Sequence, residues 1–283
     1  MVENCFVPNG TLYLRYDYHT GNINLSRCCL LKPFISIPFE DFLKIDDVID
    51  YAKKFDYQKP EQWDLSSDRC KVCNFPRTKI EQVCVGFSYA CNMKCYNCFY
   101  EGHHSDSEEL KNLYFETLEK IKGHHLESIQ LTDVGEPFFY FYKTLDYLNS
   151  LSKEKDATNI NFLTNGSLLS KERIDDLVSA SKKTGIVYSF VVSVDGITKE
   201  TYENTRIGGK FEKTIENICY LKQFFNISIN YTIRKPNMND VLKIKSFFKN
   251  LGFNRVDIYY DIYDEECKAL YYKYEDLLKA QAV

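Results

Sequence analysis

The apolar residues form two kinds of segment that alternate along the chain. Short continuous runs predict strands, and apolar residues at helical spacing between them predict helices. From about residue 80 onward, six short apolar or β-branched runs have the length and composition of buried strands; they cover residues 80–87, 128–132, 159–164, 186–194, 227–233 and 255–260. Between these runs, apolar residues recur at helical spacing. The first predicted helix has Leu110, Leu113, Leu118 and Ile121 at helical spacing, and we expect Ser105 and Glu108 to form its capping box.

The later helices are bounded by their own start and stop residues. Ser170 is expected to begin the second helix and Gly185 to end it, and Gly252 ends the last one. Strands that alternate with helices predict a parallel sheet with right-handed crossovers. Six units fit residues 80–283, whereas a full eight-unit barrel needs about 250 residues. The expected α/β fold is therefore a partial (β/α)6 TIM-like barrel, with a doubly wound open sheet as the alternative.

The first 76 residues have a different pattern. Leu12, Leu14, Tyr16 and Tyr18 alternate with polar residues, a turn follows at residues 19–22, and the alternation then resumes, which predicts a β-hairpin. A short helix is expected after Asp47. We therefore divide the chain into a small N-terminal domain, 1–76, and a core domain, 77–283.

Composition and charge exclude several classes of protein. The chain is 44% apolar and 27% charged, which is typical of globular proteins. Its net charge of −4 predicts no nucleic-acid partner. The sequence has no secretory leader and no apolar run of about 18 residues, so we expect a cytoplasmic protein with no membrane segment. In the cytoplasm, clustered cysteines bind metals or react more often than they form disulfides, and this chain has eleven.

Three cysteines lie within eight residues, directly after the first predicted core strand. Cys91, Cys95 and Cys98 have C-x3-C-x2-C spacing, so their thiolates can converge on one metal centre. A structural zinc ion requires a fourth protein ligand, and none follows at zinc-finger spacing. A four-iron cluster held by three cysteines leaves one iron open to a cofactor or substrate. Thiolates bind both zinc and iron, so the type of ligand does not decide between a zinc ion and an iron–sulfur cluster.

This spacing, on a loop after strand one of an α/β barrel, resembles the radical S-adenosylmethionine (SAM) superfamily. The resemblance implies that Cys91, Cys95 and Cys98 hold a [4Fe–4S] cluster whose open iron chelates the amino and carboxylate groups of SAM. The family usually places an aromatic residue immediately before the third cysteine. In this chain that position is Asn97, with Tyr96 before it.

Further segments at later strand ends resemble motifs of the same family. Residues 132–137 (TDVGEP) resemble the GGEP segment, which implies that Glu136 accepts hydrogen bonds from the ammonium group of SAM. Residues 164–166 (TNG) and 193–196 (SVDG) match segments that face the ribose or the substrate. Arg206 lies in a stretch, 202–209, that resembles the SPASM/twitch branch, and is implied to bind the SAM carboxylate. The implied cofactor-binding residues are Glu136, Thr164, Asn165, Ser193, Asp195 and Arg206; weaker candidates are Asn230, Thr232 and Asn237.

A second set of cysteines lies in the N-terminal quarter and comprises Cys5, Cys28, Cys29, Cys70 and Cys73. With either Cys28 or Cys29 as a ligand, the set is similar to the twitch module, which holds an auxiliary [4Fe–4S] cluster. Here the module would precede the barrel instead of following it. A closed four-cysteine zinc site is the alternative.

The resemblance implies an enzyme that reductively cleaves SAM to a 5′-deoxyadenosyl radical, which takes a hydrogen atom from the substrate. The expected outcome is oxidation or crosslinking of a peptide or small polar metabolite, with the auxiliary cluster as electron acceptor and an external reductant such as flavodoxin or ferredoxin as donor. A radical SAM epimerase acting on a peptide or sugar is the alternative within this class. A non-catalytic zinc protein with a structural or interaction role is the alternative from another class.

Overall fold

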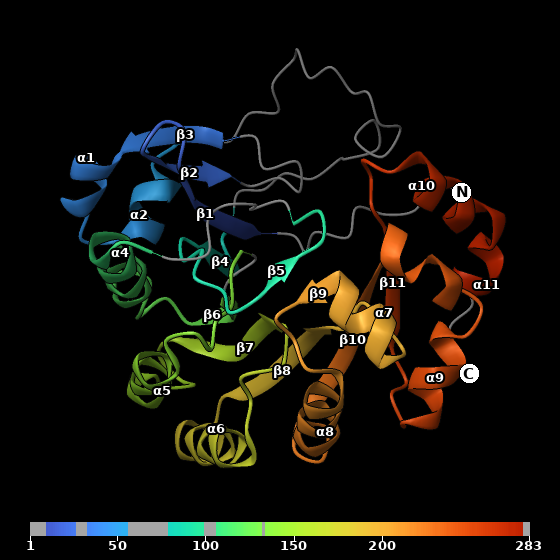
Figure 1. Cartoon of the computed structure of the whole chain (residues 1–283). Helices are drawn as coiled ribbons and strands as arrows, with labels where there is room; N and C mark the ends of the chain where they lie inside the picture. Colours follow the sequence, from blue (N-terminus) through green and yellow to red (C-terminus); the bar gives the residue numbers. More distant parts are fainter. Residues whose placement is uncertain (1–9, 27–32, 56–78, 99–105, 132–133, 280–283) are drawn as a thin grey trace.

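A nine-stranded sheet forms the centre of the molecule, a computed structural model that describes residues 10–26, 33–55, 79–98, 106–131 and 134–279 (Figure 1). The strand order is β11-β10-β8-β7-β6-β4-β1-β2-β3. The part from β4 to β11 is parallel throughout. Its strands are β4 (Gln82–Gly86), β6 (Leu126–Leu131), β7 (Ala157–Thr164), β8 (Val187–Ser193), β10 (Asn226–Ile233) and β11 (Val256–Tyr260).

The parallel strands lie in the order in which they occur in the chain, and the connecting helices lie on their outer side (Figure 1). These helices are α4 (Glu108–Glu119), α5 (Phe141–Ser150), α6 (Lys171–Thr184), α8 (Phe211–Leu221) and α9 (Ile244–Asn250). A doubly wound sheet requires a point where the strand order reverses, and this sheet has none between β4 and β11. The expected partial α/β barrel is confirmed, and the doubly wound alternative is wrong.

Shorter elements complete the described structure. They are α1 (Phe39–Leu43), α2 (Val48–Lys53), β5 (Lys94–Cys95), α7 (Lys199–Thr205), β9 (Arg206–Ile207), the 3₁₀ helix η1 (Lys235–Asp240), α10 (Glu265–Lys273) and α11 (Glu275–Lys279). None of the helices in the described ranges is long and apolar enough to cross a membrane.

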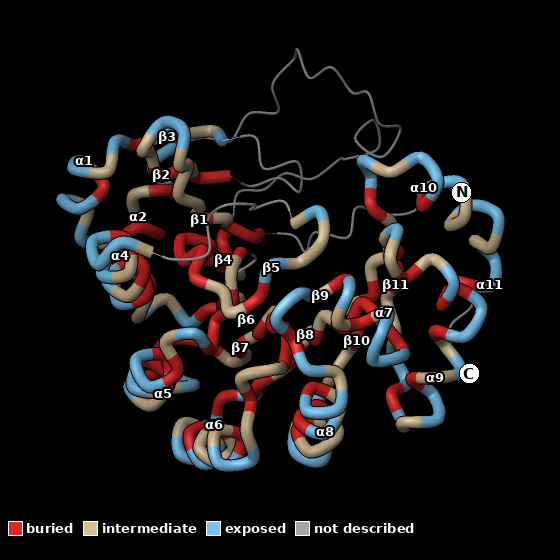
Figure 2. Tube along the Cα trace, in the orientation of Figure 1, coloured by how far each residue is buried: buried red, intermediate tan, exposed pale blue. Residues whose placement is uncertain are grey.

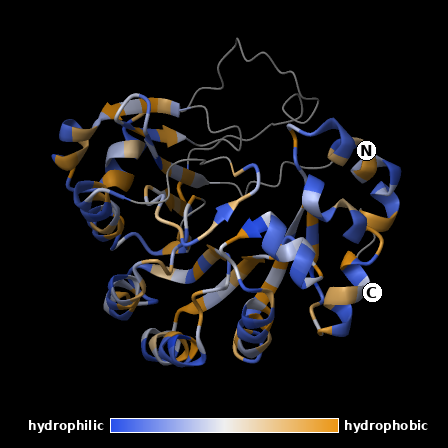
Figure 3. Cartoon of the chain, in the orientation of Figure 1, coloured by the Kyte–Doolittle hydropathy of each residue, from blue (hydrophilic) through white to orange (hydrophobic). Residues whose placement is uncertain are grey.

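The hydrophobic core lies between the sheet and the outer helices (Figure 2). On β7 and β8, Phe162 and Phe190 are buried and stack with ring centroids 4.9 Å apart, and Phe190 contacts Phe225, which directly precedes β10. The residues that alternate with them, such as Asn161 and Ser189, are half-buried and polar. The apolar and polar residues therefore separate onto the two faces of the sheet. Figure 3 shows hydrophobic and hydrophilic residues interspersed along the strands.

The predicted N-terminal hairpin is confirmed, and it continues the core sheet. Strand β1 (Thr11–Asp17) pairs with β2 (Asn22–Ser26), and β2 pairs with a further strand, β3 (Pro33–Pro38). On its other side, β1 lies parallel to β4, with Thr11 opposite Gln82. The proposed boundary at residues 76 and 77 lies outside the described residues and stays a proposal.

The predicted helix ends are partly correct. Ser170 caps α6 by accepting a hydrogen bond from the Arg173 amide, and Gly185 ends it with a left-handed φ of +71°. The capping box expected at Ser105 and Glu108 is wrong. Helix α4 begins two residues later than that box requires, and its cap is Ser107, whose hydroxyl accepts from the amide of Leu110, the first buried residue of the helix.

Candidate active site

The three-cysteine loop leaves the carboxyl end of β4 and is held against the chain that follows α7. Its short strand β5 pairs antiparallel with β9, which places Cys95 opposite Arg206. The amide of Tyr96 donates to the carbonyl of Thr205 at 2.8 Å. The carboxyl end of the barrel strands, where α/β barrels place their active sites, therefore carries the cysteines.

Two of the cysteine sulfurs have polar side chains beside them. Asn165, directly after β7, places its Nδ2 3.9 Å from the Sγ of Cys91. An Nη of Arg206 lies 3.8 Å from the Sγ of Cys95. Hydrogen bonds to ligand sulfurs are among the features that tune iron–sulfur centres. Both residues were predicted as SAM contacts, and the structure brings both to the cysteines.

The cysteines are partly buried thiols. Burial raises the pKa of the Cys91 thiol to about 11, and it also raises the pKa of the Cys95 thiol. Metal binding requires the thiolate form, so a metal bound here displaces thiol protons. These thiols are therefore poor nucleophiles in the metal-free protein and good ligands once a metal is bound.

A single metal ion requires its three ligand atoms to lie close together. Thiolates that share one tetrahedral zinc ion at about 2.3 Å lie about 3.8 Å from one another. Among the described residues, the group whose three ligand atoms all lie within 4.8 Å of one another is Asp47, Asp50 and His124, and the three cysteines do not form such a group. A four-iron cluster, in which each thiolate binds a different iron, accepts wider spacing. The three cysteine sulfurs are therefore not gathered as closely as a single bound zinc ion would hold them.

Glu136 connects the ends of two neighbouring strands. Its Oε1 accepts from the Thr164 hydroxyl at 2.6 Å, and its Oε2 accepts from the Asn165 amide at 2.7 Å. Burial raises the pKa of the Glu136 carboxyl to about 7, although these hydrogen bonds favour the ionised form. A cation placed beside this carboxylate would therefore stabilise its charge.

Gly135 lets the Glu136 segment approach the cysteine loop. It has a φ of +67°, and a Cβ at this position would lie 2.5 Å from the carbonyl oxygen of Ser88. The next amide, that of Glu136, donates to the carbonyl of Ala90 at 2.8 Å. Glycine is therefore required here both for the backbone conformation and for the close contact of the two loops.

Asp195 and Arg206 form a buried ion pair. An Nη of Arg206 lies 2.7 Å from the Oδ2 of Asp195, and the Oδ1 of Asp195 accepts from the Thr232 amide on β10. Burial lowers the pKa of Arg206, but Asp195 and Cys95 raise it more, so that the net shift is upward. The guanidinium group of Arg206 therefore stays charged, and Asp195 supplies a counter-charge for it within the protein.

The other predicted residues lie near this pair. Ser193 stands opposite Asn230 in the sheet. Asn237 is buried and donates through Nδ2 to the carbonyls of Asp195 and Thr232, which makes it a support of the site. No contact with SAM is established for any of these residues, and the assigned roles stay predictions.

On β6, β7, β8 and β10 the concave face of the sheet carries mainly neutral polar side chains, and Arg15 of β1 and Asp257 of β11 add charged groups to the same face. The barrel interior of this fold class is ordinarily filled by branched apolar side chains. Here the half-buried residues on the face away from the outer helices include Gln130, Asn161, Ser189, Ser193, Ser228 and Asn230. This face offers hydrogen-bond donors and acceptors below the cysteine loop and suits a polar ligand.

Sequence reasoning missed two residues that hold the cysteine loop. Arg234 follows β10 and donates to backbone carbonyls of the loop, and Asp261 follows β11 and accepts from the side-chain amide of Asn97. Neither belongs to a recognisable motif. The one available signal was their position, directly after a strand at the carboxyl end of the sheet.

The N-terminal cysteines Cys5, Cys28, Cys29, Cys70 and Cys73 lie outside the described residues. The described residues that flank their segments are near one another, because Thr11 pairs with Gln82, Tyr13 with Ser26, and Ser26 with Pro33. These flanks lie at the amino end of the parallel pair β1 and β4, whereas Cys91 follows the carboxyl end of β4.

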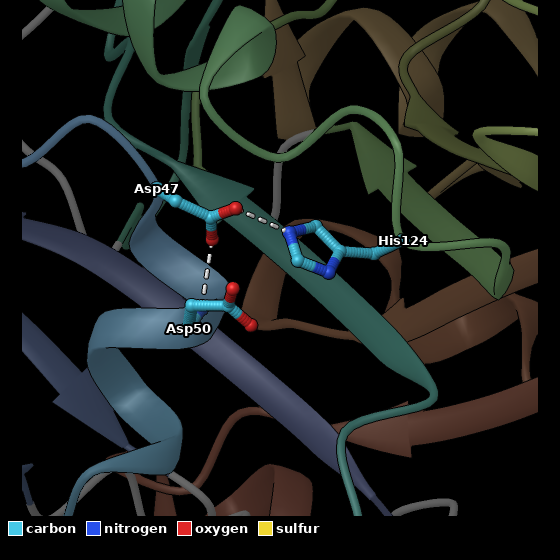
Figure 4. A group of neighbouring side chains, drawn as sticks. All are labelled: Asp47, Asp50 and His124. Atoms are coloured by element: carbon cyan, nitrogen blue, oxygen red, sulfur yellow. Dashed lines mark hydrogen bonds and ion pairs between the residues drawn. The ribbon is translucent and has the colours of Figure 1, made fainter.

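The group formed by Asp47, Asp50 and His124 has a structural explanation (Figure 4). One carboxylate oxygen of Asp47 caps α2 by accepting from the Asp50 amide at 2.7 Å, and the other lies 2.8 Å from Nε2 of His124. Asp50 pairs with Lys53. The group ties α2 to the chain after α4.

The model of the radical SAM superfamily matches residues 85–248, which include the three-cysteine loop and the strand ends from β4 to β10. The match covers more than half of the chain.

Similar proteins include enzymes of several kinds. A probable GTP 3′,8-cyclase of Saccharolobus islandicus is 25% identical over 182 residues, which cover 63% of this chain and 56% of the relative. An AdoMet-dependent heme synthase of Methanosarcina barkeri is 36% identical over 91 residues, 31% of this chain and 25% of the relative. The chain thus spans little more than half the length of the cyclases it matches.

A solved structure shares the fold. Streptococcus suis SuiB bound to its precursor peptide SuiA matches with a TM-score of 0.50 and 15% identity, over 70% of this chain and 46% of that one.

Proposed function

Because the chain belongs to the radical SAM superfamily, we propose that Cys91, Cys95 and Cys98 hold a [4Fe–4S] cluster that binds SAM. The cluster, once reduced by an external donor, would supply the one electron that cleaves SAM to methionine and a 5′-deoxyadenosyl radical, and this radical would remove a hydrogen atom from the substrate. The observation that carries this proposal is the cysteine loop itself. It places three thiols, two of them beside polar donors, at the carboxyl end of the sheet.

The residues around the loop have proposed roles in holding SAM. Glu136 accepts hydrogen bonds from its ammonium group, and this cation keeps the carboxyl ionised although burial raises its pKa to about 7. Arg206 binds the SAM carboxylate while it keeps its ion pair with Asp195. Thr164, Asn165 and Ser193 face the ribose or the substrate. The buried environment of these groups excludes water from the reacting atoms.

The proposed substrate is a peptide or a small polar metabolite. Support comes from the concave face of the sheet, which carries neutral amide and hydroxyl side chains. Oxidation or crosslinking is the proposed outcome, and epimerisation of a peptide or sugar is the alternative. The relatives named above act on different molecules, so they do not select one substrate for this chain.

We also propose that the N-terminal cysteines hold an auxiliary [4Fe–4S] cluster, with a zinc site as the alternative. The flanks of their segments meet at one end of β1 and β4, which supports a shared site. We propose that the protein works in the cytoplasm with an external one-electron donor such as flavodoxin or ferredoxin.

Anaerobic reconstitution with iron and sulfide tests the catalytic proposal. The full chain is analysed for iron, sulfide and zinc, then mixed with SAM and dithionite, and 5′-deoxyadenosine is measured. We expect about four iron atoms for the cysteine loop and about eight with an auxiliary cluster, and 5′-deoxyadenosine in both cases. Cys91→Ala, Cys95→Ala and Cys98→Ala should each abolish that product.

Cys219→Ala is the matched control, because Cys219 lies on the outer helix α8, and this variant should keep its iron and its activity. Zinc at both cysteine sets with no 5′-deoxyadenosine would contradict the proposal and support a non-catalytic zinc protein. Undiminished product from the loop variants would contradict it as well.

A further inference from the structure

We infer that Arg234 and Asp261 are a positioning pair that fixes the backbone immediately before Cys98. Arg234 follows β10 and Asp261 follows β11, whereas the cysteine loop follows β4. In the sheet, β6, β7 and β8 lie between β4 and β10. The pair therefore fastens the loop of the first core strand to the ends of the last two.

The contacts of this pair converge on residues 96 and 97. One Nη of Arg234 donates to the carbonyl of Asn97 at 2.7 Å and also to the carbonyl of Tyr96. The Asn97 Nδ2 donates to the Oδ2 of Asp261 at 2.9 Å. Charged groups make stronger hydrogen bonds than neutral ones. The guanidinium of Arg234 thus holds the backbone carbonyls of the two residues before the third cysteine. The carboxylate of Asp261 holds the side chain of Asn97.

The backbone at Asn97 explains why it needs such support. Asn97 has a φ of +48°, a left-handed conformation that asparagine tolerates better than most residues with a side chain. Its amide group also supplies the hydrogen bond to Asp261. An aromatic residue at this position would lack that donor and would favour the left-handed conformation less. Asn97, Arg234 and Asp261 therefore form one matched set.

Arg234 and Asp261 are themselves held in place. The side chains form an ion pair at 3.7 Å and are 13% and 4% exposed. The Arg234 amide donates to Oδ1 of Asn237, whose Nδ2 donates to the carbonyl of Asp195. Asp195 pairs with Arg206, which reaches Cys95. One network thus orients the loop at two successive cysteines, as supporting residues commonly do for metal ligands.

Hydrogen exchange of the metal-free protein tests the positioning role. Loss of two charge-assisted hydrogen bonds in Arg234→Gln should open the loop, so we expect a peptide covering residues 94–98 to exchange about tenfold faster or more, since 1.4 kcal/mol is a factor of ten. A peptide covering α8 should keep its wild-type rate. Arg255→Gln is the matched control, because Arg255 also pairs with an aspartate, Asp257, but its side chain is 73% exposed. It should leave both peptides unchanged.

A second measurement uses the reconstituted protein and follows the charge of the pair. Removing a positive charge near a centre that gains an electron should lower its midpoint potential in Arg234→Gln, whereas Asp261→Asn should raise it. Arg234→Lys should keep the potential close to the wild-type value and restore only part of the protection from exchange, because lysine lacks the guanidinium geometry.

Wild-type exchange at residues 94–98 in Arg234→Gln would overturn the inference. Equal acceleration in α8 would overturn it too, since it would indicate general destabilisation. Potential shifts of the same sign in Arg234→Gln and Asp261→Asn would also count against it. The link between this pair and a bound cluster rests on the proposed function. Because the exchange measurement needs no cluster, however, its outcome is distinct from a failure of the cluster proposal.

Discussion

Arg206 and Asp195 form an ion pair of 2.7 Å whose side chains are 11% and 2% exposed, and the same guanidinium reaches the sulfur of Cys95. A buried pair of this kind is strongly destabilised when one partner is removed, because the other charge is left buried and uncompensated. Loss of either partner should therefore destabilise the fold around the cysteine loop.

Asp195→Asn should lower the free energy of unfolding of the metal-free protein by about 3–5 kcal/mol, as measured by denaturant titration. The control is Glu265→Gln, which breaks the exposed pair between Glu265 and Lys268 and should change stability by less than about 1 kcal/mol. Similar losses in both variants would show that burial of the Asp195 pair has no special effect.

Glu136 should make the stability of the metal-free protein depend on pH. Its carboxyl has a pKa of about 7 in the folded chain and about 4.3 when unfolded. Between these values the folded state binds more protons than the unfolded state, so the contribution of Glu136 to stability falls as the pH rises. Above pH 7 the full cost of the buried charge is present.

Glu136→Gln removes this titration. Its stability relative to wild type should rise by about 3 kcal/mol between pH 5 and pH 8, as measured by denaturant titration without SAM. Thr164→Val serves as the control, because it removes a hydrogen bond to the carboxyl but keeps the group, and it should keep or steepen the wild-type slope. Parallel curves for wild type and Glu136→Gln would contradict the prediction.

Gly135 should tolerate no side chain, whereas Gly21 should tolerate one at moderate cost. The two glycines have nearly the same φ, +67° and +69°, but a Cβ at Gly135 meets backbone carbonyls at 2.5 and 2.8 Å, and a Cβ at Gly21 meets nothing within 4 Å. Gly21→Ala should cost about 1–2 kcal/mol from the left-handed conformation alone. Gly135→Ala should cost clearly more and reduce the iron retained after reconstitution. Equal melting temperatures for the two variants would refute this comparison.

The β-hairpin should be necessary for folding of the core. Leu12 and Leu14 on β1 are fully buried, and β1 covers the edge of β4 through parallel pairing. A chain of residues 77–283 would expose this edge and its apolar neighbours, so we expect it to aggregate or to lack a cooperative unfolding transition. Circular dichroism during thermal melting, with the full chain as control, measures this. A fragment that melts cooperatively would support the division of the chain at residue 76.

The sequence by itself determined the features that depend on local order. The length and composition of the apolar runs identified the six parallel strands from β4 to β11, because a buried strand is a short run of apolar and β-branched residues. The spacing of Cys91, Cys95 and Cys98 and its position after the first core strand predicted the family that the family model supports. The sequence also predicted the helix caps at Ser170 and Gly185, because a cap contacts only residues within one turn of its own helix.

Only the tertiary structure decided the contacts between distant segments. Nothing in the hairpin pattern distinguished a separate domain from an extension of the core sheet, because pairing of β1 with β4 depends on which edge is free. Arg234 and Asp261 belong to no recognisable sequence motif. They contact the cysteine loop because the carboxyl ends of β10 and β11 meet the loop that follows β4. Arg206 lay in a recognised segment, but its contacts with Asp195 and Cys95 depend on the pairing of β5 with β9. Local patterns are set by neighbours in the chain, whereas a site is built by strands that fold side by side.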